Sequence, residues 1–274
     1  MTRRLARPLL ALALLPLALP AHAEVRTQEV TYDVDGQEFS GYFAWDEARQ
    51  GERPGVLVLH EWWGQDAYAR RRARMLAELG YTAFALDMYG NGKVAEHPED
   101  AQAFMQSVMS DMERAERRFD KAHDLLRAHP TVAAGRTAAI GYCMGGGLAL
   151  YMARVGKELD AVVSFHGSLG AQAGVPPAGI EADLLVLTGG SDPFVPDAQV
   201  EAFRQAMEAA EVDYELHVYP GAKHAFTNPA ADRLGAEFDL PLAYDAEADA
   251  DSWQRMRRFL EQRLQAAGGN ADGG

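Results

Sequence analysis

The sequence predicts an α/β fold, with a mostly parallel central sheet of about eight strands, flanking helices and an antiparallel hairpin near the N-terminus. Two alternating segments, 28–34 and 38–44, flank Asp35-Gly36, which is a strong signal for a two-residue hairpin turn. After this hairpin, short apolar runs alternate with amphipathic segments of helix length. That alternation is typical of parallel strands joined by crossover helices.

Six apolar runs of strand length follow the hairpin and complete the predicted sheet. They cover 55–61, 82–88, 137–143, 161–167, 183–189 and 214–220. The predicted helices cover 66–79, 98–128, 144–155, 197–211 and 249–265. Acidic and basic residues alternate along 98–128, which indicates a solvated helix face and not a binding stripe.

The first 23 residues have the pattern of a secretory signal peptide. Arg3, Arg4 and Arg7 lead into an apolar run, 8–19, that is too short to cross a bilayer. Ala21-His22-Ala23 then supplies a small-x-small cleavage site. We therefore expect a leader at 1–23, one domain at 24–265, a disordered tail at 266–274, and export to the periplasm or the medium.

The charge of the chain argues against a polyanionic partner. The whole sequence has a net charge of -14, and removing a leader with three arginines and no acidic residue gives -17. This is the wrong sign for nucleic acid or an anionic membrane surface. No cluster has metal-ligand spacing, so we expect neither metal nor cofactor, and we expect a monomer whose partner is a small molecule.

The single cysteine lies in a predicted strand-turn-helix elbow. Cys143 has Gly141 and Gly145 two residues to either side, the small-x-nucleophile-x-small pattern of a strained turn that exposes a nucleophile. It also begins a helix, whose N-terminus favours a thiolate. The alternative is a buried structural cysteine beside a glycine-rich helix start.

Two further strand ends complete a candidate triad. Asp192 follows the run 183–189 and His224 follows 214–220, so the chain order is nucleophile, acid, base. In this interpretation His224 moves the proton and Asp192 holds its tautomer. The alternatives are a turn residue before proline and a loop histidine.

The other histidines carry weaker signals. His60 and His166 lie at strand ends and could line a pocket, without an assigned role in proton transfer. We expect surface positions for His97, His123 and His129.

These motifs together resemble the dienelactone hydrolase family, and the likeness covers nearly the whole chain after the leader. The elbow reads Gly-Tyr-Cys-Met-Gly-Gly-Gly, the acid lies in Gly-Gly-Ser-Asp-Pro-Phe-Val-Pro, and the base lies in Gly-Ala-Lys-His-Ala-Phe. Three other segments match as well: His60-Glu61-Trp62-Trp63-Gly64, Asp87-Met88-Tyr89, and the closing segment around Tyr244 and Trp253. The resemblance implies an α/β-hydrolase fold with a cysteine nucleophile.

The resemblance also implies further site residues. It gives Glu61 a role against the thiol, in forming the thiolate as substrate binds; an exposed loop glutamate is the alternative. It implies an oxyanion hole made by the backbone N–H groups of Met144 and Trp62. We expect the substrate pocket to include four more residues: Trp63, Tyr89, Lys93 and Phe226.

One departure from the family bears on the substrate. Better-known members hold a substrate carboxylate with two arginines, but the matching stretches here, 87–93 and 224–228, contain none. Lys93 lacks the planar two-pronged geometry of arginine. We therefore expect hydrolysis of small esters or lactones through an acyl-enzyme, with dienelactone itself disfavoured. Two alternatives remain: a non-catalytic ligand-binding or redox-sensing protein that uses the same pocket and Cys143, and an enzyme acting on a thioester or carbon–halogen bond.

Overall fold

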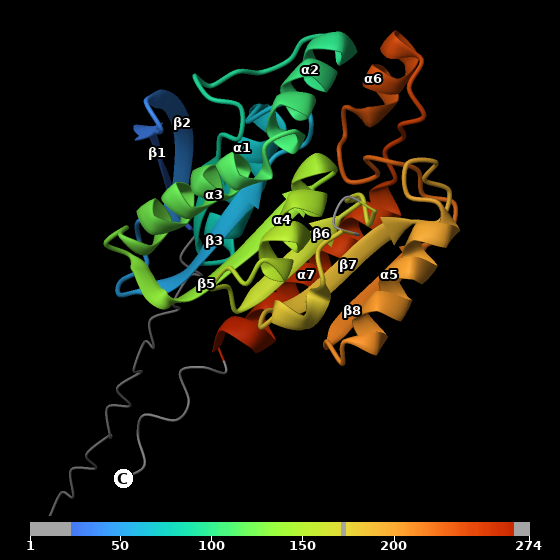
Figure 1. The fold of residues 1–274 in the computed structure, drawn as a ribbon. Helices are drawn as coiled ribbons and strands as arrows, with labels where there is room; N and C mark the ends of the chain where they lie inside the picture. The colour runs from blue at the N-terminus through green and yellow to red at the C-terminus, as the bar shows by residue number, and fades with distance from the viewer. Residues whose placement is uncertain (1–22, 171–173, 266–274) are drawn as a thin grey trace, which may run out of the picture.

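The computed structural model describes residues 23–170 and 174–265, and its centre is one eight-stranded sheet (Figure 1). The strand order is β1-β2-β4-β3-β5-β6-β7-β8. β1 and β2 pair antiparallel, β2 runs antiparallel to β4, and the remaining neighbours are parallel. The strands are β1 Val25–Val34, β2 Gln37–Asp46, β3 Arg53–Leu59, β4 Thr82–Leu86, β5 Val132–Tyr142, β6 Ala161–Phe165, β7 Asp183–Gly189 and β8 Tyr214–Tyr219. The predicted fold class is confirmed.

The N-terminal hairpin closes at the predicted turn. Asp35 and Gly36 have φ of 54° and 77°, the pair of positive values that a type I′ turn requires. The Asp33 carboxylate accepts a hydrogen bond from the Gly36 N–H at 3.0 Å. Asp-Gly is found here because its backbone tolerates a conformation that other residues resist.

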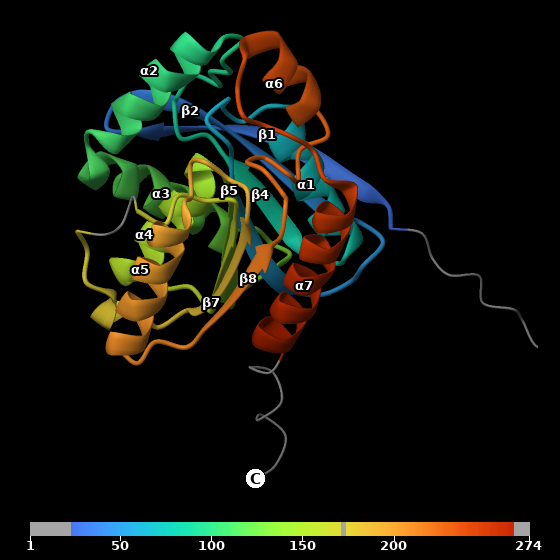
Figure 2. The same cartoon turned by 90° about the vertical axis from the view of Figure 1, so that its right-hand side faces the viewer.

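Helices cover both faces of the sheet, as Figure 2 shows. Side chains of α3, α4 and α5 pack on one face, and those of α1 and α7 pack on the other. The helices are α1 Ala67–Glu78, α2 Pro98–Met109, α3 Met112–Arg127, α4 Met144–Arg154, α5 Asp197–Ala209, α6 Ala231–Phe238 and α7 Ala246–Gln265, with a 3₁₀ turn at Pro177–Gly179. Along β3, Leu57 and Leu59 face the first layer while Val56 and Val58 face the second.

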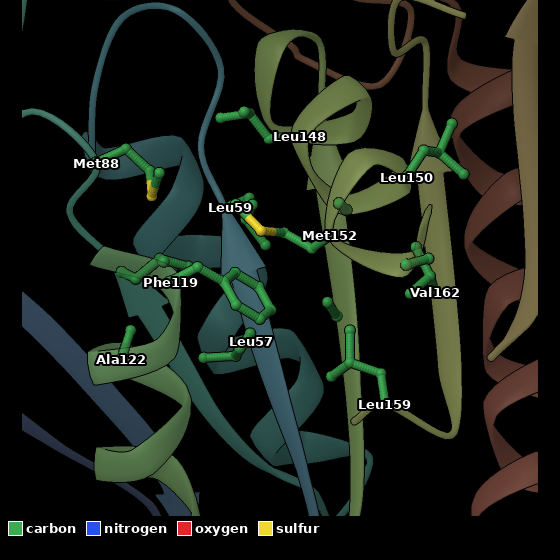
Figure 3. Close-up of a cluster of buried hydrophobic side chains, with 14 of the residues drawn as sticks. Leu57, Leu59, Met88, Phe119, Ala122, Leu148, Leu150, Met152, Leu159 and Val162 are labelled. Carbon is green, nitrogen blue, oxygen red and sulfur yellow. The ribbon is translucent and has the colours of Figure 1, made fainter. Parts of the chain in front are cut away.

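The core under α3 and α4 is tightly filled (Figure 3). Leu57, Leu59, Phe119 and Met152 are completely buried there. Each such side chain contributes about 1.5–3 kcal/mol relative to its exposed form. The sheet on which the site residues stand is held without a disulfide, because the sole cysteine of the chain is free.

The structure differs from the predicted helices in two places. The segment 98–128 is not one helix: α2 ends at Met109, and Asp111 caps α3 by accepting a hydrogen bond from the Arg114 N–H at 3.0 Å. An aspartate that caps a new helix competes with continuation of the old one. The short helix α6 was not predicted. It lies with α2 beyond the carboxyl ends of the strands, where residues from both helices surround Trp63 (Figures 1 and 2).

The predicted signal peptide, up to residue 22, and the predicted tail at 266–274 lie outside the described residues. Among the described helices, none combines the length and the hydrophobicity that a membrane span requires.

Candidate active site

Cys143 occupies a sharp turn between β5 and α4. Its φ of 53° and ψ of -118° lie outside the ordinary regions for a residue with a side chain. The turn needs both flanking glycines, because a Cβ on Gly141 would lie 2.0 Å from the Gly145 carbonyl oxygen, and one on Gly145 would lie 2.4 Å from the Leu59 carbonyl oxygen. This is the geometry of a nucleophile elbow.

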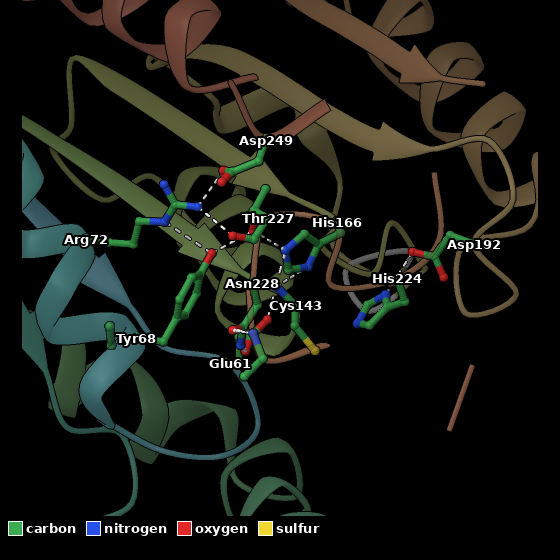
Figure 4. A network of polar contacts seen from close by, with 12 residues as sticks. Glu61, Tyr68, Arg72, Cys143, His166, Asp192, His224, Thr227, Asn228 and Asp249 are labelled. Carbon is green, nitrogen blue, oxygen red and sulfur yellow. Dashed lines mark hydrogen bonds and ion pairs between the residues drawn. The ribbon is translucent and has the colours of Figure 1, made fainter. Parts of the chain in front are cut away.

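His224 and Asp192 meet beside this turn (Figure 4). The Nδ1–H of His224 donates to Asp192 Oδ2 at 2.7 Å, and both side chains are buried. The Phe194 N–H bonds the other carboxylate oxygen at 2.8 Å, which holds Asp192 in place. Burial opposes the imidazolium, but the charge of Cys143 and hydrogen bonds with Asp192 and Cys143 outweigh it and raise the pKa of His224 to about 10. The structure thus brings the three predicted residues together.

Glu61 is buried and not an exposed loop residue. Its Oε2 accepts a hydrogen bond from the Asn228 side chain at 2.7 Å, while Oε1 has no hydrogen-bond partner among the described residues. Burial, with a smaller contribution from the negative charge of Asp66, raises the pKa of Glu61 to about 7 against the opposing effect of Asn228. No hydrogen bond joins this carboxylate to the Cys143 thiol in the described part of the chain.

Asn228 and His166 are contacts that the sequence did not assign. Asn228 follows the candidate base by four residues, in the stretch where better-known family members have an arginine. Nothing else in the sequence pointed to this residue. His166 accepts a hydrogen bond from the Cys143 N–H through its Nδ1 at 3.1 Å, so it packs under the elbow and lies outside the lining of the cavity at Cys143. His123, expected at the surface, is buried and hydrogen-bonded to Thr137 at 2.9 Å.

A largely apolar cavity of about 570 Å³ opens in front of Cys143 and His224. Its walls come from the end of β3, from α2, from the elbow, from the Asp192 loop and from the segment after α6. None of the lining residues is a lysine, arginine, aspartate or glutamate. They are Trp62, Gln102, Met105, Met109, Cys143, Met144, Gly147, Ser168, Phe194, Val195, His224, Leu240 and Leu242.

Four expected pocket residues lie outside this lining. Trp63 is buried against Phe238, because α6, which was not predicted, covers it. Phe226 is fully buried behind His166. The exposed Lys93 rests its ammonium 5.4 Å from the centre of the Phe104 ring.

Tyr89, the fourth, lies behind the cavity wall. Its hydroxyl donates to the Trp62 carbonyl at 2.8 Å and lies 3.4 Å from the Met144 sulfur. Burial, followed by the negative charges of Cys143 and Asp87, raises the pKa of Tyr89, so the phenol remains a donor. Tyr89 therefore links the two residues whose N–H groups were expected to form the oxyanion hole.

Those two N–H groups are free to bind a ligand. Neither the Trp62 nor the Met144 N–H has a hydrogen-bond acceptor among the described residues, and both residues line the cavity. Met144 is the first residue of α4, where such unpaired donors are normal. No group of three or more His, Cys, Asp or Glu side chains in the described ranges is arranged to hold a metal ion.

The sheet order, the elbow and the strand-end residues define an α/β-hydrolase. Residues 39–264 match the model of the dienelactone hydrolase family. The chain belongs to this family, and it is a hydrolase of the carboxylic ester class.

Known proteins are similar to this chain over most of their own lengths. The crystal structure of the dienelactone hydrolase-like promiscuous phosphotriesterase P91, from metagenomic libraries, is 35% identical with a TM-score of 0.80, over 88% of this chain and 99% of that one. The structure of m3DLH is 36% identical with a TM-score of 0.81, over the same shares. Protein usf of Aquifex pyrophilus is 28% identical over 242 residues, which are 86% of this chain and 99% of the relative.

Proposed function

We propose that this protein hydrolyses small, uncharged esters or lactones through a Cys143-His224-Asp192 triad and an acyl-enzyme. The observation that carries the proposal is the position of Cys143. It lies at an elbow and lines the same cavity as His224, which is itself hydrogen-bonded to Asp192. A thiolate paired with an imidazolium is a ready nucleophile at neutral pH.

The reaction proceeds in two balanced steps. The Cys143 sulfur attacks the carbonyl carbon, the C–S bond forms, and the ester oxygen leaves with the proton of His224. Water then attacks the thioester while His224 takes its proton, and the C–S bond breaks to release the acid. The N–H groups of Met144 and Trp62 stabilise the oxyanion in both steps.

Glu61 acts in this proposal as a charge beside the triad. A carboxyl group with a pKa of about 7 changes its charge in the range where the enzyme works. In its anionic form it opposes the thiolate, and it can help to form the thiolate once substrate excludes water.

The composition of the cavity supports an uncharged substrate. The lining has no lysine or arginine to hold a carboxylate, its imidazolium at His224 is engaged by Asp192, and methionine, leucine and aromatic side chains dominate it. An anionic substrate would lose its hydration there without gaining an ion pair. A cavity of about 570 Å³ has the size of ordinary small-molecule sites.

Intact-mass spectrometry during turnover of an activated neutral ester tests the proposal. We expect a transient acyl adduct on the full chain and its absence in Cys143→Ala. His224→Ala should lose at least ~10³-fold in turnover, since general acid–base catalysis supplies about 10²–10⁴-fold. Hydrolysis that survives in Cys143→Ala would assign the chain another nucleophile. A thiol that is oxidised but never acylated would favour the redox-sensing alternative.

A second candidate activity is the hydrolysis of neutral phosphotriesters. The relative P91 carries that activity in its name, and the cavity here suits an uncharged triester for the same reason that it suits a neutral ester. Assaying a neutral aryl phosphotriester with wild type and Cys143→Ala tests it. A rate equal in the two proteins would exclude the proposed site.

We also propose that residues 1–23 are a cleaved leader and that the mature enzyme is exported. The basic, apolar, Ala-x-Ala order of this segment supports the proposal. Mass spectrometry of the protein from its native cell should find an N-terminus near Glu24 outside the cytoplasm. Met1 retained on cytoplasmic protein would contradict it.

A further inference from the structure

The N–H of Cys143 has an uncommon acceptor. It bonds the Phe165 carbonyl at 3.0 Å and the Nδ1 of His166 at 3.1 Å. Both Cys143 and His166 have positive φ, 53° and 39°. Strained residues of this kind cost about 1–3 kcal/mol each and persist only where their surroundings hold them. Two strained residues therefore hold one another directly beneath the thiol.

The hydrogen bonds of His166 determine its protonation state. Since Nδ1 accepts from a backbone N–H, the imidazole is neutral and its proton lies on Nε2. Nε2 donates to Thr227 Oγ1 at 2.8 Å. Burial, followed by the positive charges of His224 and Arg72, lowers the pKa of His166 well below its ordinary value. The nearby Glu61 Oε1, at 4.0 Å, does not replace Thr227 as its partner.

A buried frame holds the far side of this imidazole, as Figure 4 shows. The hydroxyls of Thr227 and Tyr68 share a hydrogen bond of 2.6 Å. Arg72 donates to the Tyr68 hydroxyl at 3.2 Å and to the Thr227 carbonyl at 2.6 Å. Its guanidinium also pairs with Asp249 of α7 at 2.5 Å. The frame thus connects α1, α7 and the loop after β8 to the elbow.

We propose that His166 is a positioning residue for Cys143. It holds the N–H of the nucleophile through Nδ1, while Thr227 holds its Nε2–H, and together these bonds fix the direction of the thiol toward His224. The inference rests on the proposed function of Cys143. Displacing a reacting group by about 1 Å can cost on the order of 10²-fold in rate, so a small relaxation of the elbow matters.

Two substitutions of His166 separate the roles of its two ring nitrogens. In His166→Asn the amide oxygen reaches roughly the position of Nδ1 and can still accept from Cys143. In His166→Gln the amide reaches the position of Nε2 and keeps only the contact with Thr227. We expect His166→Asn to retain turnover within several-fold of wild type. His166→Gln should lose about 10- to 100-fold in kcat with little change in KM.

Alkylation of Cys143 by iodoacetamide across pH gives a readout that needs no ester. His166→Gln should move the alkylation profile to higher pH, because a displaced thiolate loses its pairing with the His224 imidazolium, whereas His166→Asn should not. Asparagine also tolerates positive φ better than glutamine. Rates are therefore compared well below the unfolding temperatures of both variants.

The chain supplies a matched control for the loss of a buried hydroxyl. Thr227→Val removes the acceptor of His166 Nε2–H and should move the alkylation profile in the same direction as His166→Gln. Thr137→Val removes the hydroxyl from another buried pair, His123 Nε2 and Thr137 Oγ1 at 2.9 Å, on α3 and β5. It should lower stability without moving the profile.

The profiles decide the outcome. The proposal is overturned if His166→Gln superimposes on His166→Asn, or if Thr227→Val superimposes on Thr137→Val. If the profiles move as expected but wild type hydrolyses no ester, the positioning role stands and the proposed function fails.

Discussion

Among the described residues, the Asn228 side chain donates the one hydrogen bond that the buried Glu61 carboxylate receives, at 2.7 Å. The second carboxylate oxygen has no partner among the described residues. A neutral amide lowers the pKa of Glu61 but does not offset burial, so the pKa stays raised at about 7. Because Glu61 is half ionised near neutrality, its ionisation should affect the stability of the protein, the reactivity of the thiol and the turnover of substrate.

The first prediction concerns stability against pH. Because folding raises the pKa of Glu61 from 4.5 to about 7, the folded state binds this proton more tightly than the unfolded state. Stability from this group is therefore present below pH 4.5 and is lost as pH rises through 7. In wild type this loss of unfolding free energy is on the order of 3 kcal/mol at most. Glu61→Gln does not undergo it, because glutamine does not titrate. In thermal unfolding, the stability of Glu61→Gln relative to that of wild type should increase between pH 4.5 and pH 8. Parallel curves across that range would mean that Glu61 is solvated.

The second prediction concerns the thiol. Above pH 7 an ionised Glu61 opposes a negative charge on the Cys143 sulfur, so Glu61→Gln should be alkylated by iodoacetamide faster than wild type. Below pH 6 the two proteins should react alike, since wild-type Glu61 is then protonated. Turnover should nevertheless decrease, because the charge that helps to form the thiolate is gone.

Slower alkylation in Glu61→Gln would instead indicate that Glu61 acts mainly on the imidazolium of His224, whose positive charge it also faces. Cys143→Ser should be nearly inactive in either case, because a hydroxyl is far harder to deprotonate than a thiol.

The third prediction concerns substrate charge. The cavity lining contains no lysine or arginine, so a neutral lactone should be hydrolysed with a higher kcat/KM than its carboxylate-bearing analogue. Lys93→Ala should leave this preference unchanged, because its ammonium lies over Phe104 and outside the lining. A preference for the carboxylate that disappears in Lys93→Ala would mean that Lys93 reaches the substrate.

The fourth prediction concerns Phe194 at the rim of the cavity. This side chain is 48% exposed, and its ring lies edge-on to His224 with centroids 5.0 Å apart. Since half of its surface is already in water, Phe194→Ala should cost little stability. It should raise KM for apolar esters several-fold, because a substrate loses an apolar surface beside the base. Steady-state kinetics with a short and a long acyl ester measure this, and equal KM changes for both would argue against contact with the acyl chain.

Alternation and strand-end motifs were sufficient for the sheet, because apolar runs and turn residues report directly on which backbone is buried and where it bends. The break at Asp111 was harder to predict, since a capping aspartate within an amphipathic segment can also lie on a continuous helix surface. The helix α6 has only eight residues, too few for a periodic pattern to identify it.

The candidate triad could be placed from the sequence alone, because each member follows its own strand and parallel strands end at one edge of the sheet. Cys143, Asp192 and His224 needed only that topology. The roles of His166, Thr227 and Asn228 were decided by tertiary structure. Their partners lie far away in the chain, and whether a strand-end side chain turns into the cavity or under the elbow depends on which hydrogen-bonding groups the fold brings beside it. The same limit applies to the four residues expected to line the pocket, which are Trp63, Tyr89, Lys93 and Phe226. They follow or lie near the correct strands, but the helices packed across the sheet determine which side chains face the cavity.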